Sequence, residues 1–467
     1  MRIPSKLIAF YHKLDEFDET RQLSSLLRSY AVVKYSNETP EVSLTAAIRD
    51  LISLAIQFLK GMFWNVSSIE LEAGLPILTF MSPRPHLYKM NDLLANEFSE
   101  GCNRAYFYNS DGLLQSSPTS ILAGLPHKVL SREVLMNWRS ISQATKLFRN
   151  YVKEEQLSVT HVLPFWVHAI RQYAALGSFK KLFRDKKFPF IVCEYDQYNQ
   201  IAAFLMAAKL SGISTYTQTH GLLNTQYAYT PLIANKIFVW GNYHKKVLMD
   251  WGIAKENILV SGAIQYQSNP EIDFKTRLQV LDELKLNERI VVIATNPMTN
   301  AIRKALIEFI NNFALSIPAD WSIILRPHPS ESKDDYVATV KKLNNVQVLN
   351  NQELDMVLLM QISTVAMVWN SAFAIDALVN RIPTIQIKLN FKDAGEVTKL
   401  VELGLIPSFN EPQEIIDFMG SLKIINDSNT HELNDEQFQK FKMEYCINFG
   451  EEAAKQMHRY IEQECQT

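Results

Sequence analysis

Short apolar segments alternate with helix-forming segments from about residue 150 onward, and this alternation constrains the fold more than any other feature. The apolar segments 189–193 (PFIVC), 236–240 (KIFVW) and 289–294 (RIVVIA) have the length of buried strands. A helix-forming segment such as 201–213 stands between consecutive strands. Strands and helices that alternate at this spacing build parallel sheets through βαβ units. The sequence therefore predicts an α/β fold.

The length of 467 residues exceeds what one hydrophobic core normally serves, so we expect two Rossmann-like domains. A polar segment, 265–277, separates two series of strands and helices and is predicted to be a linker. The predicted boundaries place an N-terminal domain at 1–267, a C-terminal domain at 268–434 and a helical tail at 435–467. The tail is expected to pack back toward the first domain.

The first 150 residues give a weaker pattern, with strands predicted at 6–11, 77–80 and 105–108. No secretory signal peptide is apparent at the N-terminus. The apolar run 51–64 (LISLAIQFLKGMFW) is shorter than the ~20 residues of a transmembrane helix. We expect it to form a buried helix, with a membrane-surface helix as the alternative.

Composition excludes several classes of protein. A net charge of −2 offers no electrostatic footprint for nucleic acid. The four cysteines lie far apart and form no CxxC pair, which argues against a metal site and for a reducing compartment. We therefore expect a cytoplasmic protein with no metal ion, possible peripheral contact with the inner membrane, and no nucleic-acid partner.

Polar residues follow several predicted strands at their carboxyl ends, where ligands bind in open α/β sheets. Two α/β domains that face each other would bring such residues to one cleft. The clusters are Glu194 with Asp196, Gln218 with His220, Arg326 with His328, and Asn370 with Ser371.

The segment 326–330 (RPHPS) directly follows an apolar strand and has proline on both sides of His328. Proline fixes φ and removes a backbone donor, so Pro327 and Pro329 stiffen the loop around the histidine. Arg326 can bind a carboxylate or phosphate with two hydrogen bonds, and His328 can donate to a phosphate oxygen. The alternative is a turn whose arginine pairs with a nearby aspartate.

The segment 369–378 (WNSAFAIDAL) predicts a helix capped by Asn370 or Ser371. Backbone N–H groups at a helix start can bind phosphate, although an ordinary cap explains the same residues. Thr295 and Asn296, after strand 289–294, give a third polar edge to the predicted donor site.

Glu194 and Asp196 end a buried strand, where burial can raise the pKa of a carboxylate so that it serves as a general base. A solvated acidic loop is an equal alternative for either residue alone. His220, in the loop TQTHG, is a competing base or a group that stabilises the leaving phosphate. A histidine satisfied within the core is the ordinary alternative.

A family resemblance covers about residues 185–390. The segments QTHG, KIFVWGNYHKKVLMDWGI, ILVSG, ILRPHPS, VWNSAFAIDAL and RIPTIQI resemble bacterial GT-B glycosyltransferases that build surface polysaccharides. Among these, the chain is similar in style to the Kdo and sialic-acid transferases with an HP motif and to the CDP-glycerol glycerophosphotransferases. The resemblance implies that His328 and Ser371 contact the donor nucleotide or its phosphates and that an acid near Asp196 activates the acceptor. Glu194-Tyr195-Asp196-Gln197 departs from the acidic-acidic-Gly motif of many such enzymes, which leaves the donor sugar and the base open.

The leading hypothesis is a metal-independent GT-B glycosyltransferase without a cofactor. It would move a sugar from a nucleotide-activated donor, such as CMP-Kdo or CMP-nonulosonate, to a glycan or glycolipid hydroxyl. The C-terminal domain would bind the donor and the N-terminal domain the acceptor, and Gly262, after predicted strand 258–261, is included with the donor-binding residues. The alternatives are a glycerophosphotransferase, a UDP-sugar 2-epimerase and a non-catalytic assembly protein.

Overall fold

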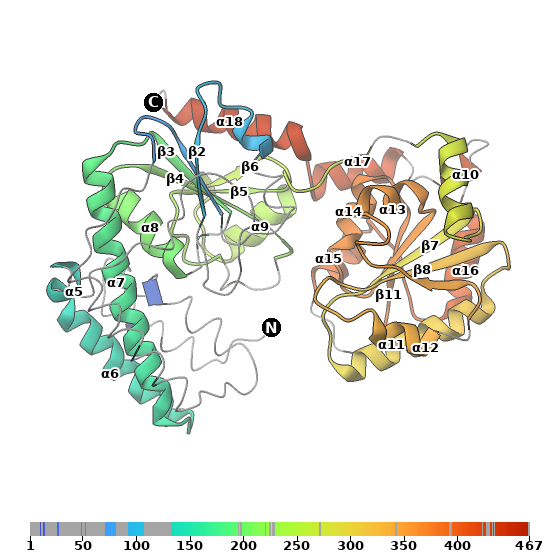
Figure 1. Cartoon of the computed structure of the whole chain (residues 1–467), viewed down its shortest axis with the longest axis horizontal. Helices are drawn as coiled ribbons and strands as arrows, with labels where there is room; N and C mark the ends of the chain where they lie inside the picture. Colours follow the sequence, from blue (N-terminus) through green and yellow to red (C-terminus); the bar gives the residue numbers. More distant parts are fainter. Residues whose placement is uncertain are drawn as a thin grey trace. The chain divides into compact units, whose positions relative to one another are not determined.

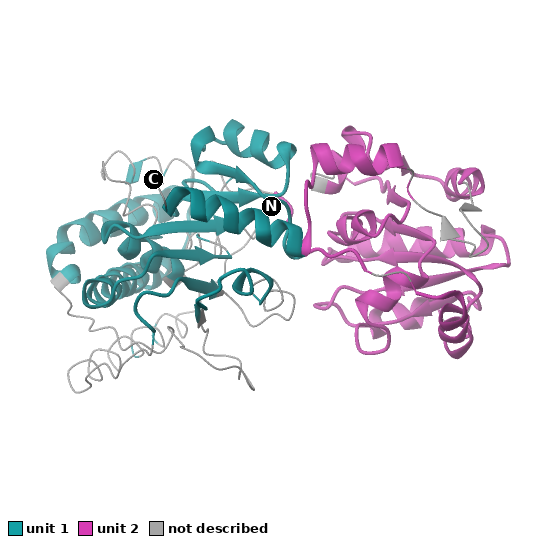
Figure 2. Cartoon of the chain, turned by 90° about the horizontal axis from the view of Figure 1, so that it is seen from above, with its two compact units in different colours: residues 1–220, 225–265, 451–467 teal, residues 221–224, 266–450 magenta. Residues whose placement is uncertain are grey.

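The computed structural model divides into two compact units (Figure 2). Unit 1 comprises residues 1–220, 225–265 and 451–467, and unit 2 comprises residues 221–224 and 266–450. The structure describes residues 10, 13–14, 26–27, 48, 52, 71–80, 92–106, 132–194, 196, 199–219, 221–223, 226, 229–269, 272–340, 343–391, 395–422, 424–425, 430–431, 433 and 435–465.

Unit 1 contains a parallel six-stranded sheet in the order β2-β1-β3-β4-β5-β6. The order reverses between β1 and β3, and Thr79, Cys193 and Thr217 stand in one row near the carboxyl ends of β1, β3 and β4. The strands are β1 (Ile77–Phe80), β2 (Asn103–Tyr106), β3 (Phe190–Cys193), β4 (Ser214–Gln218), β5 (Lys236–Val239) and β6 (Ile258–Val260).

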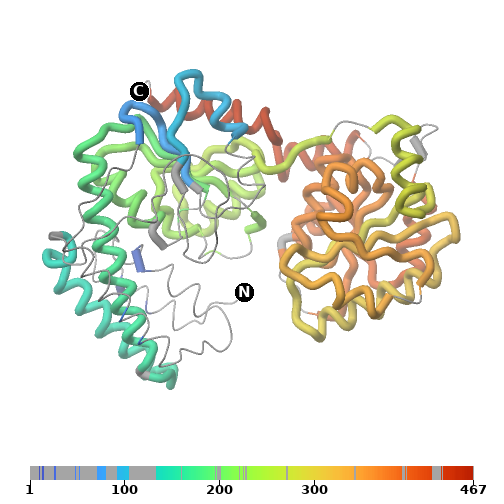
Figure 3. Tube along the Cα trace, in the orientation of Figure 1, coloured from blue at the N-terminus to red at the C-terminus, as the bar shows by residue number. Residues whose placement is uncertain are grey.

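Helices cover both faces of this sheet, as the trace in Figure 3 also shows. The long helix α7 and helix α8 pack on one face, because both are apolar around most of their circumference. Helix α6 is amphipathic and packs against α7 through Phe148, whose ring stacks on Phe165 at 4.1 Å. The helices are α5 (Arg132–Met136), α6 (Trp138–Glu154), α7 (Val162–Asp185), α8 (Asn199–Leu210), α9 (Asn242–Asp250) and α18 (Gly450–Cys465), with short 3-10 turns at Val159–His161 and Lys255–Asn257.

The C-terminal helix α18 covers the opposite face of the unit 1 sheet (Figure 1). Met457 and Ile461 are buried in one cluster with strand residues such as Phe238. Near the end of the helix, Glu464 accepts a hydrogen bond from the hydroxyl of Tyr216 at 2.9 Å and pairs with Lys236. Burial, followed by the hydrogen bond to Glu464, raises the pKa of Tyr216 far above its ordinary value. The end of the chain is thus part of the core of unit 1.

Unit 2 contains a second parallel six-stranded sheet, in the order β12-β11-β10-β7-β8-β9. The order reverses between β7 and β10, which makes this pair the topological switch point. The strands are β7 (Arg289–Ala294), β8 (Trp321–Arg326), β9 (Val346–Val348), β10 (Val365–Val368), β11 (Thr384–Ile387) and β12 (Ser408–Phe409), and β13 (Ile424–Ile425) pairs separately with β14 (Thr430–His431).

Helices α10 and α16 of unit 2 begin at recognisable caps. The side chain of Asp273 accepts from the backbone N–H of Thr276 at the start of α10, and Pro412 opens α16 behind a capping box. The helices are α10 (Phe274–Glu283), α11 (Asn300–Ser316), α12 (Asp334–Val340), α13 (Met356–Ile362), α14 (Phe373–Val379), α15 (Glu396–Glu402), α16 (Pro412–Ser421) and α17 (Asp435–Glu444).

The predicted fold class, α/β with two Rossmann-like domains, is confirmed. The arrangement of the domains across a cleft and the boundaries at 267/268 and 434/435 stay predictions. The linker predicted at 265–277 ends earlier, since the cap at Asp273 starts a helix within it. The predicted strand 6–11 and the run 51–64 lie outside the described residues apart from Phe10 and Ile52.

We predict that Met457→Ala destabilises unit 1 by about 2–5 kcal/mol, because the truncation leaves a cavity between α18 and the sheet. Chemical denaturation followed by circular dichroism measures the free energy of unfolding. Met249→Ala is the matched control, since Met249 is 41% exposed and its loss should change stability by no more than about 0.5 kcal/mol. Equal effects of the two substitutions would contradict the packing of α18.

Candidate site at the carboxyl edge of the unit 2 sheet

Three neighbouring strands, β10, β7 and β8, end at the same level of the unit 2 sheet. Ala294 is the last residue of β7 and pairs with Val368 of β10 on one side and Arg326 of β8 on the other. Polar residues follow each strand within three positions: Thr295 and Asn296 after β7, His328 after β8, and Asn370 and Ser371 after β10. The structure therefore brings these predicted donor-binding residues to one edge, at the switch point of the sheet.

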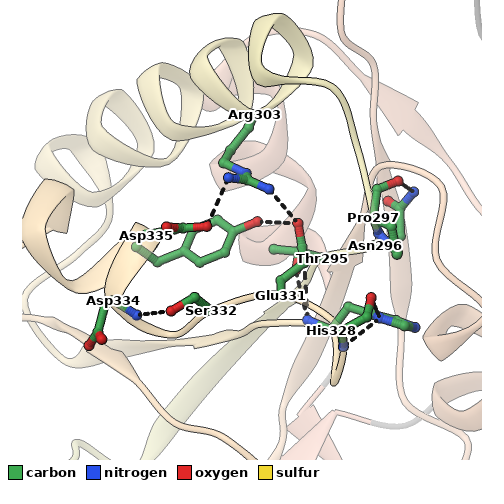
Figure 4. A network of polar contacts seen from close by, with 11 residues as sticks. Thr295, Asn296, Pro297, Arg303, His328, Glu331, Ser332, Asp334 and Asp335 are labelled. Carbon is green, nitrogen blue, oxygen red and sulfur yellow. Dashed lines mark hydrogen bonds and ion pairs between the residues drawn. The ribbon is translucent and has the colours of Figure 1, made fainter. Parts of the chain in front are cut away.

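The carboxylate of Glu331 anchors the loop that carries His328 (Figure 4). One carboxylate oxygen accepts a hydrogen bond from the hydroxyl of Tyr336 at 2.9 Å and lies 3.4 Å from the guanidinium of Arg303. The other accepts from the hydroxyl of Thr295. The Glu331 side chain is only 3% exposed, so these donors compensate its charge in a site with little water. Sequence reasoning missed Glu331, because its partners come from three separate elements.

The donors and acceptors of this network can be assigned without ambiguity. An ionised Glu331 only accepts, so the Thr295 hydroxyl must donate to it. The same hydroxyl oxygen then accepts from the backbone N–H of His328 at 3.0 Å. The backbone N–H of Glu331 donates back to the carbonyl of His328 at 2.8 Å. The main chain of His328 is therefore fixed on both sides.

The imidazole of His328 is held in one tautomer. Its Nδ1 lies 3.1 Å from the backbone N–H of Ser330, which can only donate, and 2.8 Å from the hydroxyl of Ser330. Nδ1 is thus the acceptor, and the neutral ring carries its proton on Nε2. Figure 4 shows the ring edge that carries Nε2 turned away from the Glu331 network. His328 is partly exposed and Pro329 is exposed.

Arg326 has a different environment from the one that the sequence predicts. Its side chain is buried and donates to the carbonyls of Leu349 and Asn350, at 3.1 and 2.6 Å, and to the side chain of Asn351. Burial lowers the pKa of Arg326, while Asp355 and Glu353 act in the opposite direction. The guanidinium thus joins β8 to the loop after β9, and phosphate binding by Arg326 stays a prediction.

Asn370 packs against the backbone of Gly395, the residue before α15. A Cβ on Gly395 would lie 1.9 Å from the Oδ1 of Asn370, so only glycine permits this approach. Helix α14 has Ala372 at its N-cap with no side-chain cap bond, which corrects the predicted cap at Asn370 or Ser371. The Ser371 hydroxyl instead accepts from the backbone N–H of Phe373 at 3.4 Å.

Two amide oxygens at the switch point are buried and accept no hydrogen bond from the described part of the chain. They are Oδ1 of Asn296 and Oδ1 of Asn370. The Nδ2 of Asn296 donates to the carbonyl of Pro297 at 3.3 Å, which orients its oxygen the other way. Buried acceptors without donors are costly, and such groups concentrate where a ligand or water completes the bonding.

The predicted residues of unit 1 lie in varied environments. Asp196 is fully buried, and its Oδ2 accepts from the backbone N–H groups of Ile233 and Ala234 at 2.8 and 3.2 Å. This gives Asp196 a structural role, and its role as a base stays a prediction. Glu194 is buried at the carboxyl end of β3, while His220 lies outside the described residues.

Gly262 belongs to unit 1 and follows the edge strand β6. Its φ of +101° favours glycine, and its backbone N–H donates to the carbonyl of Val239 at 3.2 Å. Gly262 is thus not in the unit that carries the other predicted donor-binding residues, and its role in binding stays a prediction.

At the carboxyl edge of the unit 1 sheet, the sequence pointed to Gln218 but missed two buried threonines in the same row. Thr79, Thr217 and Gln218 are buried, and Oγ1 of both threonines and Oε1 of the glutamine accept no hydrogen bond from described residues. Thr79 lies next to the switch point between β1 and β3. The sequence did not reveal that Thr79 and Thr217 have unpaired hydroxyl oxygens, because threonine is ordinary in short strands.

Neither a metal cluster nor a membrane span is found within the described residues. No group of three or more His, Cys, Asp or Glu side chains there could hold a metal ion. No helix among them has both the length and the apolar character needed to span a bilayer.

Comparison with known proteins gives similarity at the level of structure. No protein-family model matches the sequence, and no curated protein matches it. The structure is similar to a Listeria monocytogenes protein provisionally described as a UDP-N-acetylglucosamine 2-epimerase, with a TM-score of 0.51, 11% identity, and coverage of 84% of this chain and 97% of that chain. This similarity shows the fold, two Rossmann-like domains of the GT-B kind.

Two further structures match with lower scores. The UDP-GlcNAc 2-epimerase of Methanocaldococcus jannaschii has a TM-score of 0.49 and 13% identity, over 83% of this chain and 100% of that chain. The S. aureus MnaA–UDP co-structure has a TM-score of 0.49 and 11% identity, over 84% of this chain and 97% of that chain.

Asp376, on α14, is a carboxyl group whose ionisation should oppose folding. It is partly buried, and burial raises its pKa to about 7. An unfolded aspartate has a pKa of roughly 3.9, so between these values the folded chain holds a proton that the unfolded chain has released. The free energy of unfolding therefore falls as pH rises from about 4 to 7 and is level above that.

We predict that Asp376→Asn removes this dependence. The free energy of unfolding of the variant, minus that of wild type, should be about 1–3 kcal/mol larger at about pH 8 than at about pH 4.5. Denaturation at both pH values measures the difference. Asp282→Asn, at an exposed position on α10, is the control and should show no such change. A variant whose relative stability is the same at both pH values would contradict the burial of the charge.

Proposed function

We propose that the protein is an enzyme that acts on a nucleotide-activated sugar and binds the nucleotide at the carboxyl edge of the unit 2 sheet. The observation that carries the proposal is the convergence of Asn296, His328 and Asn370 at the switch point between β7 and β10. A polar edge at a switch point is where open α/β sheets bind ligands.

His328 supplies the phosphate contact in this proposal. Its fixed tautomer presents Nε2–H as a donor, and a donor suits the acceptor-only oxygens of a diphosphate. The stiff Arg326–Glu331 loop holds the donor in place before the ligand arrives, which lowers the entropic cost of binding. Ser371 follows β10 at the same edge of the sheet, and its role in nucleotide binding stays a prediction.

A uridine nucleotide is the better expectation for the base. The fold similarity to a protein described as acting on UDP-N-acetylglucosamine supports it, and nothing in the site favours cytidine. We therefore replace the cytidine-activated donor expected from the sequence by a UDP-sugar.

Two reactions fit such a site, and the fold similarity favours the first. In a 2-epimerase, one carbon of the UDP-sugar is inverted with no acceptor present. In a glycosyltransferase, an acceptor hydroxyl attacks the anomeric carbon, the bond to the phosphate oxygen breaks, UDP leaves, and a base takes the hydroxyl proton. Glu194, Asp196 and His220 stay the candidates that the sequence predicts for proton transfer.

Turnover assays separate these reactions. The purified protein is incubated with UDP-N-acetylglucosamine alone, and the sugar products are resolved by NMR. Epimerised sugar without acceptor supports the epimerase. Release of UDP only when a glycan or glycolipid acceptor is added supports the transferase. Absence of turnover under both conditions contradicts both enzymes and leaves a binding protein.

We predict that His328→Ala weakens UDP binding about 10- to 100-fold, which is the value of a hydrogen bond to a charged group. Isothermal titration calorimetry measures the dissociation constant, and circular dichroism confirms the fold. His458→Ala, on α18 of unit 1, is the control and should bind UDP like wild type. Unchanged affinity of His328→Ala would exclude the phosphate contact, and failure of the wild-type protein to bind UDP would exclude the proposed nucleotide site.

A further inference from the structure

The exposed side of helix α6 in unit 1 carries a row of cations. Arg139, Lys146, Arg149 and Lys153 are all exposed and recur at spacings of seven, three and four residues, which place them on one face of the helix. We call these four residues the basic face. No ion pair joins any of them to the described residues. The acidic residue of α6, Glu154, is its last residue.

An exposed apolar group stands at the start of this helix. Leu135 is 60% exposed, Met136 is 66% exposed and Trp138 is 45% exposed. We call these three residues the apolar tip. Single exposed apolar residues are ordinary, but three within four positions, one of them tryptophan, form a patch that gains free energy by leaving water. The tip and the basic face are continuous along the chain.

The apolar tip is held in place by the rest of unit 1. Val134 is buried, and Glu133 pairs with Lys180 of α7 at 3.1 Å, so α5 is fixed onto α7. The ring of Trp138 packs edge-on against Trp166 of α7, with centroids 6.2 Å apart. Figure 1 shows α5 and α6 alongside α7 on the flank of the unit. The exposure of the tip is thus a property of the fold.

We propose that the basic face and the apolar tip form a docking surface for a membrane with anionic lipids. Lysine and arginine attract the negative lipid headgroups, and tryptophan with long apolar side chains enters the boundary between headgroups and acyl chains. The positive charge of this surface complements the negative charge of the lipid headgroups. The positive charge is local to the surface, because the whole chain has a net charge of −2. Nucleic acid would engage the cations but offers nothing to Leu135 and Met136.

This surface goes beyond the proposed sugar-nucleotide chemistry and depends only on unit 1. The contact is peripheral, since no described helix can span a bilayer. The sequence gave a membrane-surface helix at 51–64 as an alternative, and that run lies outside the described residues apart from Ile52, so the surface proposed here rests on α5 and α6 alone. An enzyme held there would meet sugar acceptors or carriers that carry a lipid anchor.

Vesicle sedimentation tests the proposal with the full-length protein. Vesicles of phosphatidylglycerol mixed with phosphatidylcholine are compared with pure phosphatidylcholine, at low and high salt. We expect the protein to sediment with the anionic vesicles and to be released by salt. The triple variant Lys146→Glu, Arg149→Glu, Lys153→Glu should lower the partition coefficient about 100-fold or more, since each cation near the surface contributes about fivefold.

A second variant separates the two parts of the surface. Leu135→Ser with Met136→Ser should lower partitioning about tenfold, from the loss of apolar burial, and leave the salt dependence unchanged. Both sets of positions are exposed, so the fold should be kept, and UDP binding without vesicles reports on it independently.

A charge-matched control has the same number of reversals elsewhere on unit 1. Lys209, Lys246 and Lys255 are exposed, and their replacement by glutamate should leave most of the binding intact. The proposal is overturned if wild type ignores anionic vesicles, if the control loses as much binding as the α6 variant, or if the same cations bind RNA while vesicles are not bound. A wild-type protein that binds UDP but does not bind anionic vesicles would refute only the docking surface, and a wild-type protein that binds anionic vesicles but does not bind UDP would refute only the proposed function.

Discussion

Parallel pairing of strands is the constraint on which the rest of this structure depends. A parallel sheet aligns the carboxyl ends of its strands along one edge, so residues far apart in the sequence meet there. Ala294 stands between Val368 and Arg326, and the residues after these three positions become neighbours. Both sheets use this arrangement, and both change strand order next to a row of buried polar groups. The candidate chemistry of the protein follows from where these strands end.

Preorganisation distinguishes the unit 2 edge from an ordinary strand end. Glu331 fixes Thr295, Thr295 fixes the backbone of His328, and Ser330 fixes its ring. Each step uses a group that can act only as donor or only as acceptor, so the network has one arrangement. A histidine held in this way can meet a phosphate without reorganising, as the proposed nucleotide site requires.

The carboxyl edge of the unit 2 sheet and the basic face of α6 differ in how many free cations they present. The unit 2 edge contains few cations for an anionic ligand, because the guanidinium of Arg326 binds carbonyls and that of Arg303 binds carboxylates. The cations of α6, by contrast, face solvent without carboxylate partners among the described residues. The first arrangement depends on oriented hydrogen bonds, while the second depends on long-range attraction that salt screens.

The sequence by itself determined the alternation of strands and helices and the residues at the strand ends. Strands 77–80 and 289–294 match the structure at both ends, since apolar runs between polar turns leave little choice of boundary. It also placed His328 and Asn370 at carboxyl ends, because this position follows from the chain direction. Only the tertiary structure decided which polar residues are used internally. Asp196 and Arg326 bind backbone groups, Glu331 serves as the anchor, and Gly395 makes room for Asn370. These roles depend on contacts between segments distant in the sequence, and a local pattern does not encode which segments will meet.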